Sequence, residues 1–327
     1  MKHISILVPH GAMMANVEGP RQLFQCVNQY FAMEGKEPMV NAQLVGIANE
    51  TKLRDGHYTV RPDKLISEVD KTDLIIIPAL DGDMKQLIEA NSAFIPWIVS
   101  QYKRGAEVAS LCVGAFLLAS TGLLNGRRCA THWMFANEFR AMYPEVELVV
   151  EKIITDENGI YSSGGAFSYL NLMLHLIEKY AGRNVAVFCS KLFQIDMDRA
   201  SQSPFIIFQG QKDHEDEPVK KAQEFIEQNV SEKITVDQLA SMFALGRRNL
   251  ERRFKKATSN TIAEYIQRVK IEAAKKHLET SRKNINEVMY DVGYNDTKAF
   301  RTIFKKVTGL SPMEYRNKYN KEALVLA

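Results

Sequence analysis

The strongest candidate for chemistry in this sequence is a cysteine on a tight turn. Cys112 lies in the segment SLCVGAFLLAS, residues 110–120, after an apolar run and before a segment of small residues. A cysteine at a strand-to-helix turn acts as a nucleophile when a neighbouring base makes its thiolate and a third group orients that base. The pattern therefore allows two interpretations, a catalytic thiol or a turn that keeps only the architecture of a catalytic site.

The backbone of the same turn offers a second kind of chemistry. A helix near 114–120 would present unpaired N–H groups at its start, and such groups favour a carboxylate or another anion. Elsewhere the chain has no G-x-x-x-x-G-K phosphate loop, and its seven histidines lack metal-ligand spacing. We therefore predict no metal site and no cofactor. Core packing is the preferred interpretation of His175, in LMLHLIEKY, and of Trp97 and Trp133, which are also capable of caging a cationic amine.

An α/β domain is needed to position this turn. Short apolar segments typical of buried parallel strands alternate with helical patterns in the first half of the chain. This alternation predicts a doubly wound α/β domain of flavodoxin-like type. Strands are predicted at 3–9, 40–48, 72–80 and 106–112, helices near 19–34, 83–103 and 166–181, and a hairpin within 147–163.

The second half of the chain contains an internal repeat with an offset of 50 residues. Its first copy holds the segment Phe254-Lys255-Lys256, which recurs as Phe304-Lys305-Lys306. Each copy is predicted to contain a short helix, a tight turn and a longer basic helix with a narrow apolar seam. The short helices are expected at 235–242 and 285–291, the longer ones at 246–257 and 296–307, and a connecting helix at 260–279.

This arrangement predicts two helix-turn-helix units. The seam would fix the longer helix to its domain, while exposed side chains reach base edges and phosphates in the major groove. Two such helices on one chain could enter successive major grooves of double-stranded DNA. The alternative is a helical array that binds protein. The predicted DNA contacts are Arg247, Arg248, Asn249, Arg252, Lys256, Thr297, Lys298, Arg301 and Lys305.

Charge divides the chain in the same place. From residue 218 onward there are 22 basic and 13 acidic side chains, whereas residues 1–217 hold 20 basic and 26 acidic ones. Such asymmetry suggests an acidic module joined to one that binds a polyanion. The polar segment QKDHEDE ends just before Pro218 and is the best linker. We predict a sensor domain at 1–203, a linker at 204–217, a DNA-binding domain at 218–320 and a tail at 321–327.

Composition limits the protein class further. The first residues are too short and too strand-like for a signal peptide, and no apolar run reaches the roughly 20 residues of a membrane-spanning helix. The four cysteines lie far apart in the sequence with no C-x-x-C pair. This spacing argues against a disulfide framework or a zinc site and favours the reducing cytoplasm.

The last hundred residues resemble the AraC-type transcription regulators. The segment DVGYNDTKAFRTIFKKVTGLSPMEYR, residues 291–316, resembles their signature, and the resemblance covers about 219–320. The first copy departs from the pattern, because Ser259 and Ile262 replace an expected glycine and proline and Gly246 replaces a capping serine. We expect a slightly different turn there and an unchanged function, since glycine is a tolerated N-cap.

The first half resembles the PfpI-like, class I glutamine-amidotransferase-like domains, and in particular the GlxA-like regulators in which such a domain precedes an AraC module. The segments EGPRQLFQ (18–25), SLCVGAFLLASTGLLNGRRCATHW (110–133) and GGAFSYLNLMLHLIEKYAG (164–182) carry the resemblance. It implies a transcription activator or repressor whose first domain senses an amine, a betaine or an amino acid.

The resemblance also bears on catalysis. Val113 stands where PfpI-type hydrolases have a histidine, and the His-x-Glu of the amidotransferases is missing. Counting back four residues from Pro20 gives Asn16 where a carboxylate is expected, although Glu18 is near. His132 is predicted as a hydrogen-bonding pocket residue. We therefore predict no catalysis and a ligand pocket formed by Asn16, Cys112, Val113, His132 and Gly164.

The sequence thus predicts a transcription regulator that binds operator DNA and a small-molecule effector. A homodimer through the α/β domain is expected, with contact to RNA polymerase as a further possibility and no membrane partner. Two alternatives stay open: a cysteine-dependent amidase or aldehyde-processing hydrolase with a DNA-targeting module, and a redox sensor that acts through Cys112.

Overall fold

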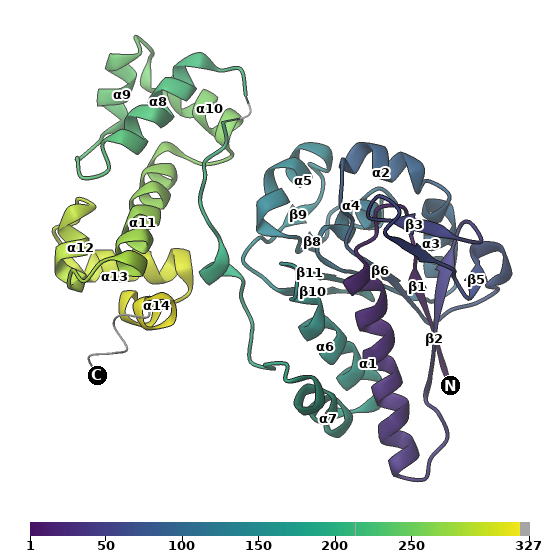
Figure 1. Ribbon diagram of the computed structural model, residues 1–327. Coiled ribbons are helices and arrows are strands. Elements are labelled where there is room, and N and C mark those ends of the chain that lie inside the picture. Colours follow the sequence, from purple (N-terminus) through teal and green to yellow (C-terminus); the bar gives the residue numbers. More distant parts are fainter. Residues whose placement is uncertain (213, 321–327) are drawn as a thin grey trace. The chain divides into compact units, whose positions relative to one another are not determined.

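The computed structural model describes residues 1–212 and 214–320 (Figure 1). The chain divides into two compact units, Met1–Gln202 and Ser203–Ala327. The predicted tail at 321–327 lies outside the described residues. No helix in the described part of the chain is long and apolar enough to cross a membrane.

A seven-stranded sheet forms the centre of the first unit, in the order β10-β11-β7-β6-β1-β2-β5. Neighbouring strands run parallel except for β10, which forms an antiparallel hairpin with β11. The predicted doubly wound α/β domain is therefore confirmed. The strands are β1 (Lys2–Leu7), β2 (Val40–Gly46), β5 (Lys64–Leu65), β6 (Leu74–Ile77), β7 (Glu107–Ser110), β10 (Ile154–Glu157) and β11 (Ile160–Ser163).

Helices cover both faces of this sheet, because its apolar strands must be buried on both sides. One core lies between the sheet and α1, α6 and α7, and a second lies between the sheet and α2 to α5 (Figure 1). Two short strand pairs, β3 (Thr51–Leu53) with β4 (Tyr58–Val60) and β8 (Arg128–Cys129) with β9 (Glu147–Leu148), lie outside the main sheet. The helices are α1 (Met14–Met33), α2 (Met84–Ala90), α3 (Phe94–Lys103), α4 (Ala115–Ala119), α5 (Ala136–Met142), α6 (Tyr169–Ala181) and α7 (Arg183–Phe193).

Two predicted helices differ in extent from the observed ones. The single helix expected at 83–103 is broken at Asn91, whose side chain accepts a hydrogen bond from the His10 N–H at 2.8 Å and donates to the carbonyls of His10 and Leu87. Helix α1 begins at Met14, five residues before the expected start at residue 19. Pro20 lies inside α1 rather than at its start, and the helix continues through it.

The described part of the second unit is helical throughout, as predicted. Two small cores, one for each copy of the repeat, share the long connecting helix α11 (Figure 1). Each copy places a short helix, α9 or α12, before a twelve-residue helix, α10 or α13. The helices are α8 (Glu217–Gln228), α9 (Val236–Met242), α10 (Arg247–Thr258), α11 (Ile262–Thr280), α12 (Ile285–Asp291), α13 (Thr297–Thr308) and α14 (Pro312–Tyr319).

The segment that enters the second unit packs along α11. The buried Lys275 ammonium donates to the carbonyl of Ile206 at 2.6 Å, and the backbone N–H of Phe208 donates to Glu272 at 3.1 Å. The Phe208 ring also meets the Tyr265 ring edge to face, with centroids 5.1 Å apart. Residues 206–208 are thus fixed to the second unit by both hydrogen bonds and ring packing.

Candidate functional site

The Cys112 turn, residues 111–115, has the backbone geometry of a strained strand-to-helix connection. Cys112 follows β7 with a φ of +54°, a left-handed conformation that non-glycine residues seldom adopt. A short 3-10 turn, Cys112–Gly114, then leads into α4. Gly114 is required because a Cβ there would lie 2.4 Å from the carbonyl oxygen of Pro78. The turn therefore packs directly against the carboxyl end of β6.

Hydrogen bonds from neighbouring segments hold the backbone of Cys112. Its N–H donates to the Ser163 hydroxyl at 3.2 Å, and its carbonyl accepts from the Thr131 hydroxyl at 3.0 Å. The residue is 4% exposed, and burial raises the pKa of the Cys112 thiol to about 12. At neutral pH this sulfur is therefore a protonated thiol, in contrast to the thiolate that nucleophilic catalysis uses.

Asn16 lies on the first turn of α1, which the Met13 N–H anchors to the carbonyl of Ala79 at 2.9 Å. Asn16 is 2% exposed, and its side-chain Nδ2 has no hydrogen-bond partner among the described residues. A buried amide N–H without an acceptor costs roughly 1–3 kcal/mol, so such a group in a folded protein calls for a reason. Glu18, the other candidate for the missing carboxylate, is bound by Arg21 at 2.8 Å.

His132 is half-buried beside the loop that follows β11. Its Nδ1 accepts the backbone N–H of Met134 at 3.1 Å, and burial lowers the pKa of His132. The ring lies close to Gly165, because a Cβ built on that glycine would meet His132 Cδ2 at 4.0 Å. Gly164 is buried, and a Cβ there would come within 2.5 Å of the Gln202 amide. His132 is thus a neutral side chain whose ring is oriented by the hydrogen bond from Met134.

Two polar residues near His132 were not predicted from the sequence as members of the site. Ser168 is fully buried, with a hydroxyl that has no partner among the described residues, and it lies 3.9 Å from a Cβ built on Gly165. Gln202 accepts the Gly165 N–H at 3.0 Å and donates to the carbonyl of Thr131 at 3.0 Å. No local pattern marks either residue, because their roles depend on loops distant in the chain.

All five predicted pocket residues lie at one edge of the sheet. They follow the carboxyl ends of β1, β7 and β11, or belong to the 130–132 loop that is hydrogen-bonded to that edge. This edge is where open α/β sheets bind their ligands. His175, in contrast, is exposed on α6 with its Nε2 3.4 Å from Asp156, so the expectation of a core histidine is wrong. The apolar residues around it in the sequence face the core, whereas position 175 faces out.

The helices α10 and α13 are attached by the predicted apolar seam. Leu250 and Phe254 are fully buried in one copy, and Phe300 and Phe304 in the other. The predicted DNA contacts lie on the remaining surface, and all are exposed except Thr297, which is partly buried. Each helix thus presents a basic face to solvent, as a recognition helix must.

Some of these side chains have partners within the unit. The Arg247 guanidinium binds Asp237 at 3.1 Å and Glu251 at 3.3 Å. Arg252 donates to the side-chain oxygen of Asn249 at 3.1 Å. These exposed contacts are weak individually, so DNA can replace them at little cost.

The turns around the two basic helices share their left-handed residues but differ before the helix. The turn at 243–246 is one residue shorter than the turn at 292–296, and Gly246 supplies no capping side chain whereas Asp296 does. Ala244 (φ +51°), two residues after the end of α9, takes the place that Gly293 (φ +72°) has two residues after the end of α12. Ser259 ends α10 in the same left-handed region, with φ +55°, as Gly309 ends α13, with φ +75°. The expectation of a different turn at Ser259 is therefore not met, because the serine adopts the conformation that glycine favours.

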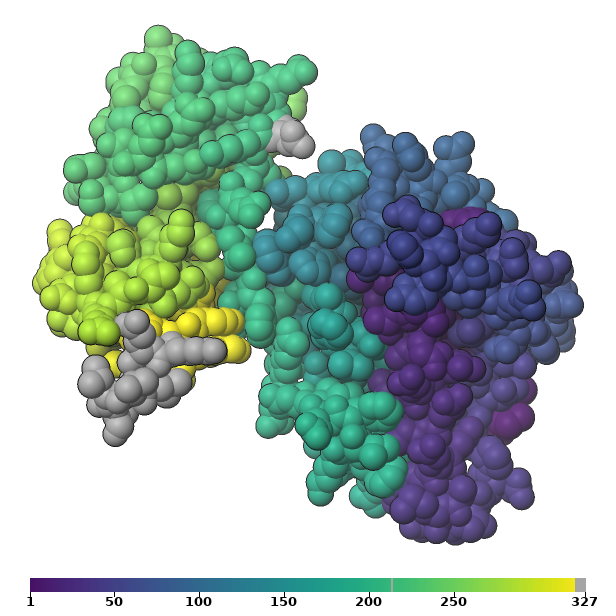
Figure 2. Space-filling view, in the orientation of Figure 1, coloured from purple at the N-terminus to yellow at the C-terminus, as the bar shows by residue number. Residues whose placement is uncertain are grey.

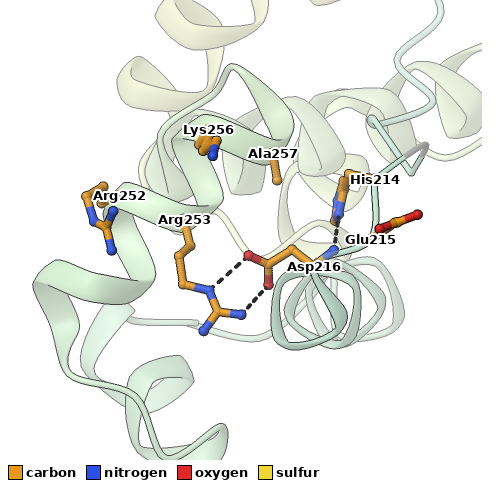
Figure 3. A pocket seen from close by; sticks show the side chains of 7 residues that line it. All are labelled: His214, Glu215, Asp216, Arg252, Arg253, Lys256 and Ala257. Atoms are coloured by element: carbon orange, nitrogen blue, oxygen red, sulfur yellow. Dashed lines mark hydrogen bonds and ion pairs between the residues drawn. The ribbon is translucent and has the colours of Figure 1, made fainter.

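A cavity of about 460 Å³ lies beside α10 in the second unit (Figure 3). The Arg253 guanidinium crosses it to bind both carboxylate oxygens of Asp216, at 2.8 and 2.9 Å. His214 Nδ1 accepts the backbone N–H of Asp216 at 3.2 Å. The cavity is lined by His214, Glu215, Asp216, Arg252, Arg253, Lys256 and Ala257.

The fold and these two sites define a class: an α/β domain with a buried cysteine turn at the carboxyl ends of its strands, together with a unit that contains two helix-turn-helix motifs. A model of the DJ-1/PfpI family matches residues 3–179, and a model of a helix-turn-helix domain matches residues 239–318. The chain belongs to the DJ-1/PfpI family and carries a helix-turn-helix domain of AraC type.

Known regulators are similar over most of the chain. The HTH-type transcriptional regulator GbdR from Pseudomonas aeruginosa is 26% identical over 79% of this chain and 69% of that protein. The HTH-type transcriptional regulator ArgR from the same organism is 25% identical over 78% of this chain and 73% of that protein. The crystal structure of Drosophila melanogaster DJ-1beta, 16% identical, covers 60% of this chain and 98% of its own with a TM-score of 0.50, and it shows the fold alone. Both of these Pseudomonas relatives align across the two units, and both are transcriptional regulators.

Proposed function

We propose that this protein is a transcription regulator that binds operator DNA through α10 and α13 and a small metabolite through its α/β unit. The observation that carries the proposal is the pair of exposed basic helices, each fixed by a buried seam, in a chain that also holds a DJ-1/PfpI domain. The two helices would contact successive major grooves, which a rigid α11 between them favours. Arg248 and Lys298 are each the exposed second residue of the helix, and the first residues of a recognition helix commonly contact base edges.

The effector is proposed to carry a carboxylate, as amino acids and betaines do. The unpartnered Nδ2 of Asn16 is a donor that suits a carboxylate oxygen, and the buried Ser168 hydroxyl is a second donor without a partner among the described residues. Satisfying these buried groups would remove the cost of leaving them unpaired, which gives the ligand affinity and selectivity. Cys112, Val113, His132 and Gly164 would line the same pocket.

The pocket is proposed to sense and not to catalyse. A nucleophilic cysteine needs a base within hydrogen-bond reach, whereas the Cys112 thiol is buried with a pKa raised to about 12. The Nδ1 of His132 is engaged by the Met134 N–H. A cysteine-dependent hydrolase is the alternative, and it requires turnover that Cys112→Ala abolishes.

Effector binding is proposed to act through a homodimer formed by the α/β units, with RNA polymerase as the partner on DNA and the cytoplasm as the location. The ligand can shift DNA binding only by its differential affinity for the two arrangements of the units. A tight ligand without such a preference would leave DNA affinity unchanged.

The full-length chain tests both halves of the proposal. Duplexes selected by the protein from a random pool should bind at least about 10³-fold more tightly than scrambled duplexes. Absence of any preference would contradict a sequence-specific regulator.

A panel of amines, betaines, amino acids and aldehydes, screened by thermal unfolding, should contain a carboxylate that stabilises the chain and is recovered unchanged. Asn16→Leu should abolish that stabilisation, whereas Asn28→Leu, at an amide bound to Val40 far from the pocket edge, should preserve it. Consumption of the ligand would favour the hydrolase.

A further inference from the structure

Two cysteines that are 163 residues apart in the sequence lie in contact in the first unit. Cys26 on α1 and Cys189 on α7 place their sulfur atoms 3.1 Å apart, and both thiols are free. The two residues are 2% and 0% exposed. Helices α1 and α7 lie side by side, as the space-filling view also shows (Figure 2).

The packing around the pair is buried and apolar. One helical turn from Cys26, the Tyr30 ring meets the Phe188 ring edge to face at 5.2 Å, next to Cys189 in the chain. Both cysteines belong to the core cluster that α1, α6 and α7 form against the sheet. The two sulfurs are therefore held together by the helix packing, and a change of about 1 Å would bring them to the 2.05 Å of a disulfide bond.

We propose that Cys26 and Cys189 are a redox-sensitive pair that hydrogen peroxide converts into a disulfide joining α1 to α7. This site is separate from the Cys112 turn and does not depend on the proposed effector pocket. It replaces Cys112 as the thiol site where the chain responds to an oxidant, because Cys112 has no cysteine partner at such a distance among the described residues.

The hydrogen bond between the sulfurs sets the order of the reaction. The Cys189 S–H donates to the Cys26 sulfur, which lowers the pKa of Cys26 and raises that of Cys189. The Cys26 thiolate attacks one oxygen of the peroxide, the O–O bond breaks, and the leaving hydroxide takes up a proton as water. Cys26 is then a sulfenic acid.

The Cys189 sulfur closes the bond in a second step. It loses its proton and attacks the Cys26 sulfur, the S–O bond breaks, and the hydroxyl leaves with that proton as water. Two thiols and one peroxide thus give one disulfide and two waters, with two electrons passing from sulfur to oxygen. Because both sulfurs are buried, local opening between α1 and α7 admits the peroxide and sets the rate.

The disulfide would have a measurable effect on stability. It closes a long loop and thereby restricts the unfolded chain, so the melting temperature of the first unit should rise by about 5–15 °C. Reduction with dithiothreitol should reverse the change.

The test uses the full-length protein, treated with hydrogen peroxide at pH 7.4, blocked with N-ethylmaleimide and mapped by non-reducing peptide mass spectrometry. We expect a mass loss of about 2 Da from the two lost hydrogens and a cross-linked peptide that contains Cys26 and Cys189. A double variant, Cys112→Ala with Cys129→Ala, should give the same cross-link, whereas Cys26→Ala and Cys189→Ala should not.

Three results would overturn the proposal: a cross-link between other cysteines, sulfinic acid at Cys26 without a cross-link, or two unmodified thiols under peroxide that oxidises Cys112. The peptide map of the unaltered chain decides among these even if a cysteine variant fails to fold.

Discussion

Asp216 and Arg253 join the start of α8 to the middle of α10 by two hydrogen bonds, at 2.8 and 2.9 Å (Figure 3). The same carboxylate is the N-cap of α8, where it accepts the Val219 N–H at 3.2 Å. The Asp216 side chain thus caps α8, the first helix of the DNA-binding unit, and also binds α10, the proposed recognition helix of the first copy. The hydrogen bond from Arg253 lowers the pKa of Asp216.

This pair predicts an acid-dependent stability. Because the folded-state pKa of Asp216 lies below its unfolded value of about 3.9, its contribution is present above that pH and is lost as the pH falls through the folded pKa. Asp216→Ala should destabilise the chain by about 1 kcal/mol from the lost cap alone. Asp216→Asn keeps a capping oxygen and should cost less at pH 7. Denaturant unfolding at pH 7 and pH 3 measures both, and equal losses at the two pH values would contradict the ion-pair role.

Arg301 is the predicted base-reading residue of α13. Replacing it by alanine should cost about 1–3 kcal/mol of DNA binding and relax the preference at one base pair. Fluorescence anisotropy with the selected duplex and its single-base variants measures the effect. A matched control is Arg282→Ala, outside both recognition helices. An even loss over all duplexes would assign Arg301 to a phosphate.

DNA affinity of the full chain should fall steeply with salt. Neutralising about five or six phosphates gives a slope near −5 in a plot of log affinity against log salt concentration. Lys298→Ala, at an exposed site near the start of α13, should reduce that slope by about one. A flat salt response would rule against the two basic faces as the DNA-binding surface.

The Cys112 thiol should react slowly with alkylating agents. A pKa of about 12 leaves roughly 10³-fold less thiolate at pH 8 than a free cysteine has, so the rate should rise with pH up to about 12. Iodoacetamide labelling, followed by peptide mass spectrometry, gives the rate, with the urea-unfolded chain as the reference. Rapid labelling with a midpoint near pH 7 would instead support a catalytic thiolate.

Ala244 occupies a left-handed position that its repeat partner fills with Gly293. Ala244→Gly should stabilise the second unit by about 0.5–1 kcal/mol, because the left-handed strain exceeds the entropy that glycine adds to the unfolded chain. Ala222→Gly, in the interior of α8, should destabilise it by about 1 kcal/mol or more. Thermal unfolding compares the two, and a loss of stability in Ala244→Gly would contradict the strain argument.

The sequence by itself determined the two-part architecture and the helices of the second unit. Strong periodicity places Leu250, Phe254, Phe300 and Phe304 on buried faces, since a helix that leaves its apolar seam in water is unstable. The repeat then transfers the boundaries of α10 to α13, because both ends of these helices are 50 residues apart. The sequence pattern did not predict the break between α2 and α3 at Asn91. That break depends on hydrogen bonds between the Asn91 side chain and the backbone of His10, which is 81 residues away in the sequence.

Only the tertiary structure reveals the unpartnered polar groups and the thiol pair. The Asn16 amide on α1 and the Ser168 hydroxyl before α6 are buried without a partner among the described residues, and Gln202 joins Gly165 to Thr131. These features depend on segments that are distant in the sequence, so no local pattern encodes them. The spacing of the four cysteines in the sequence likewise predicted no pair among them. The packing of α7 on α1 nevertheless places the sulfur atoms of Cys26 and Cys189 3.1 Å apart. The periodicity of the sequence indicates which face of a helix or strand is buried, whereas only the tertiary structure shows which residues that face contacts.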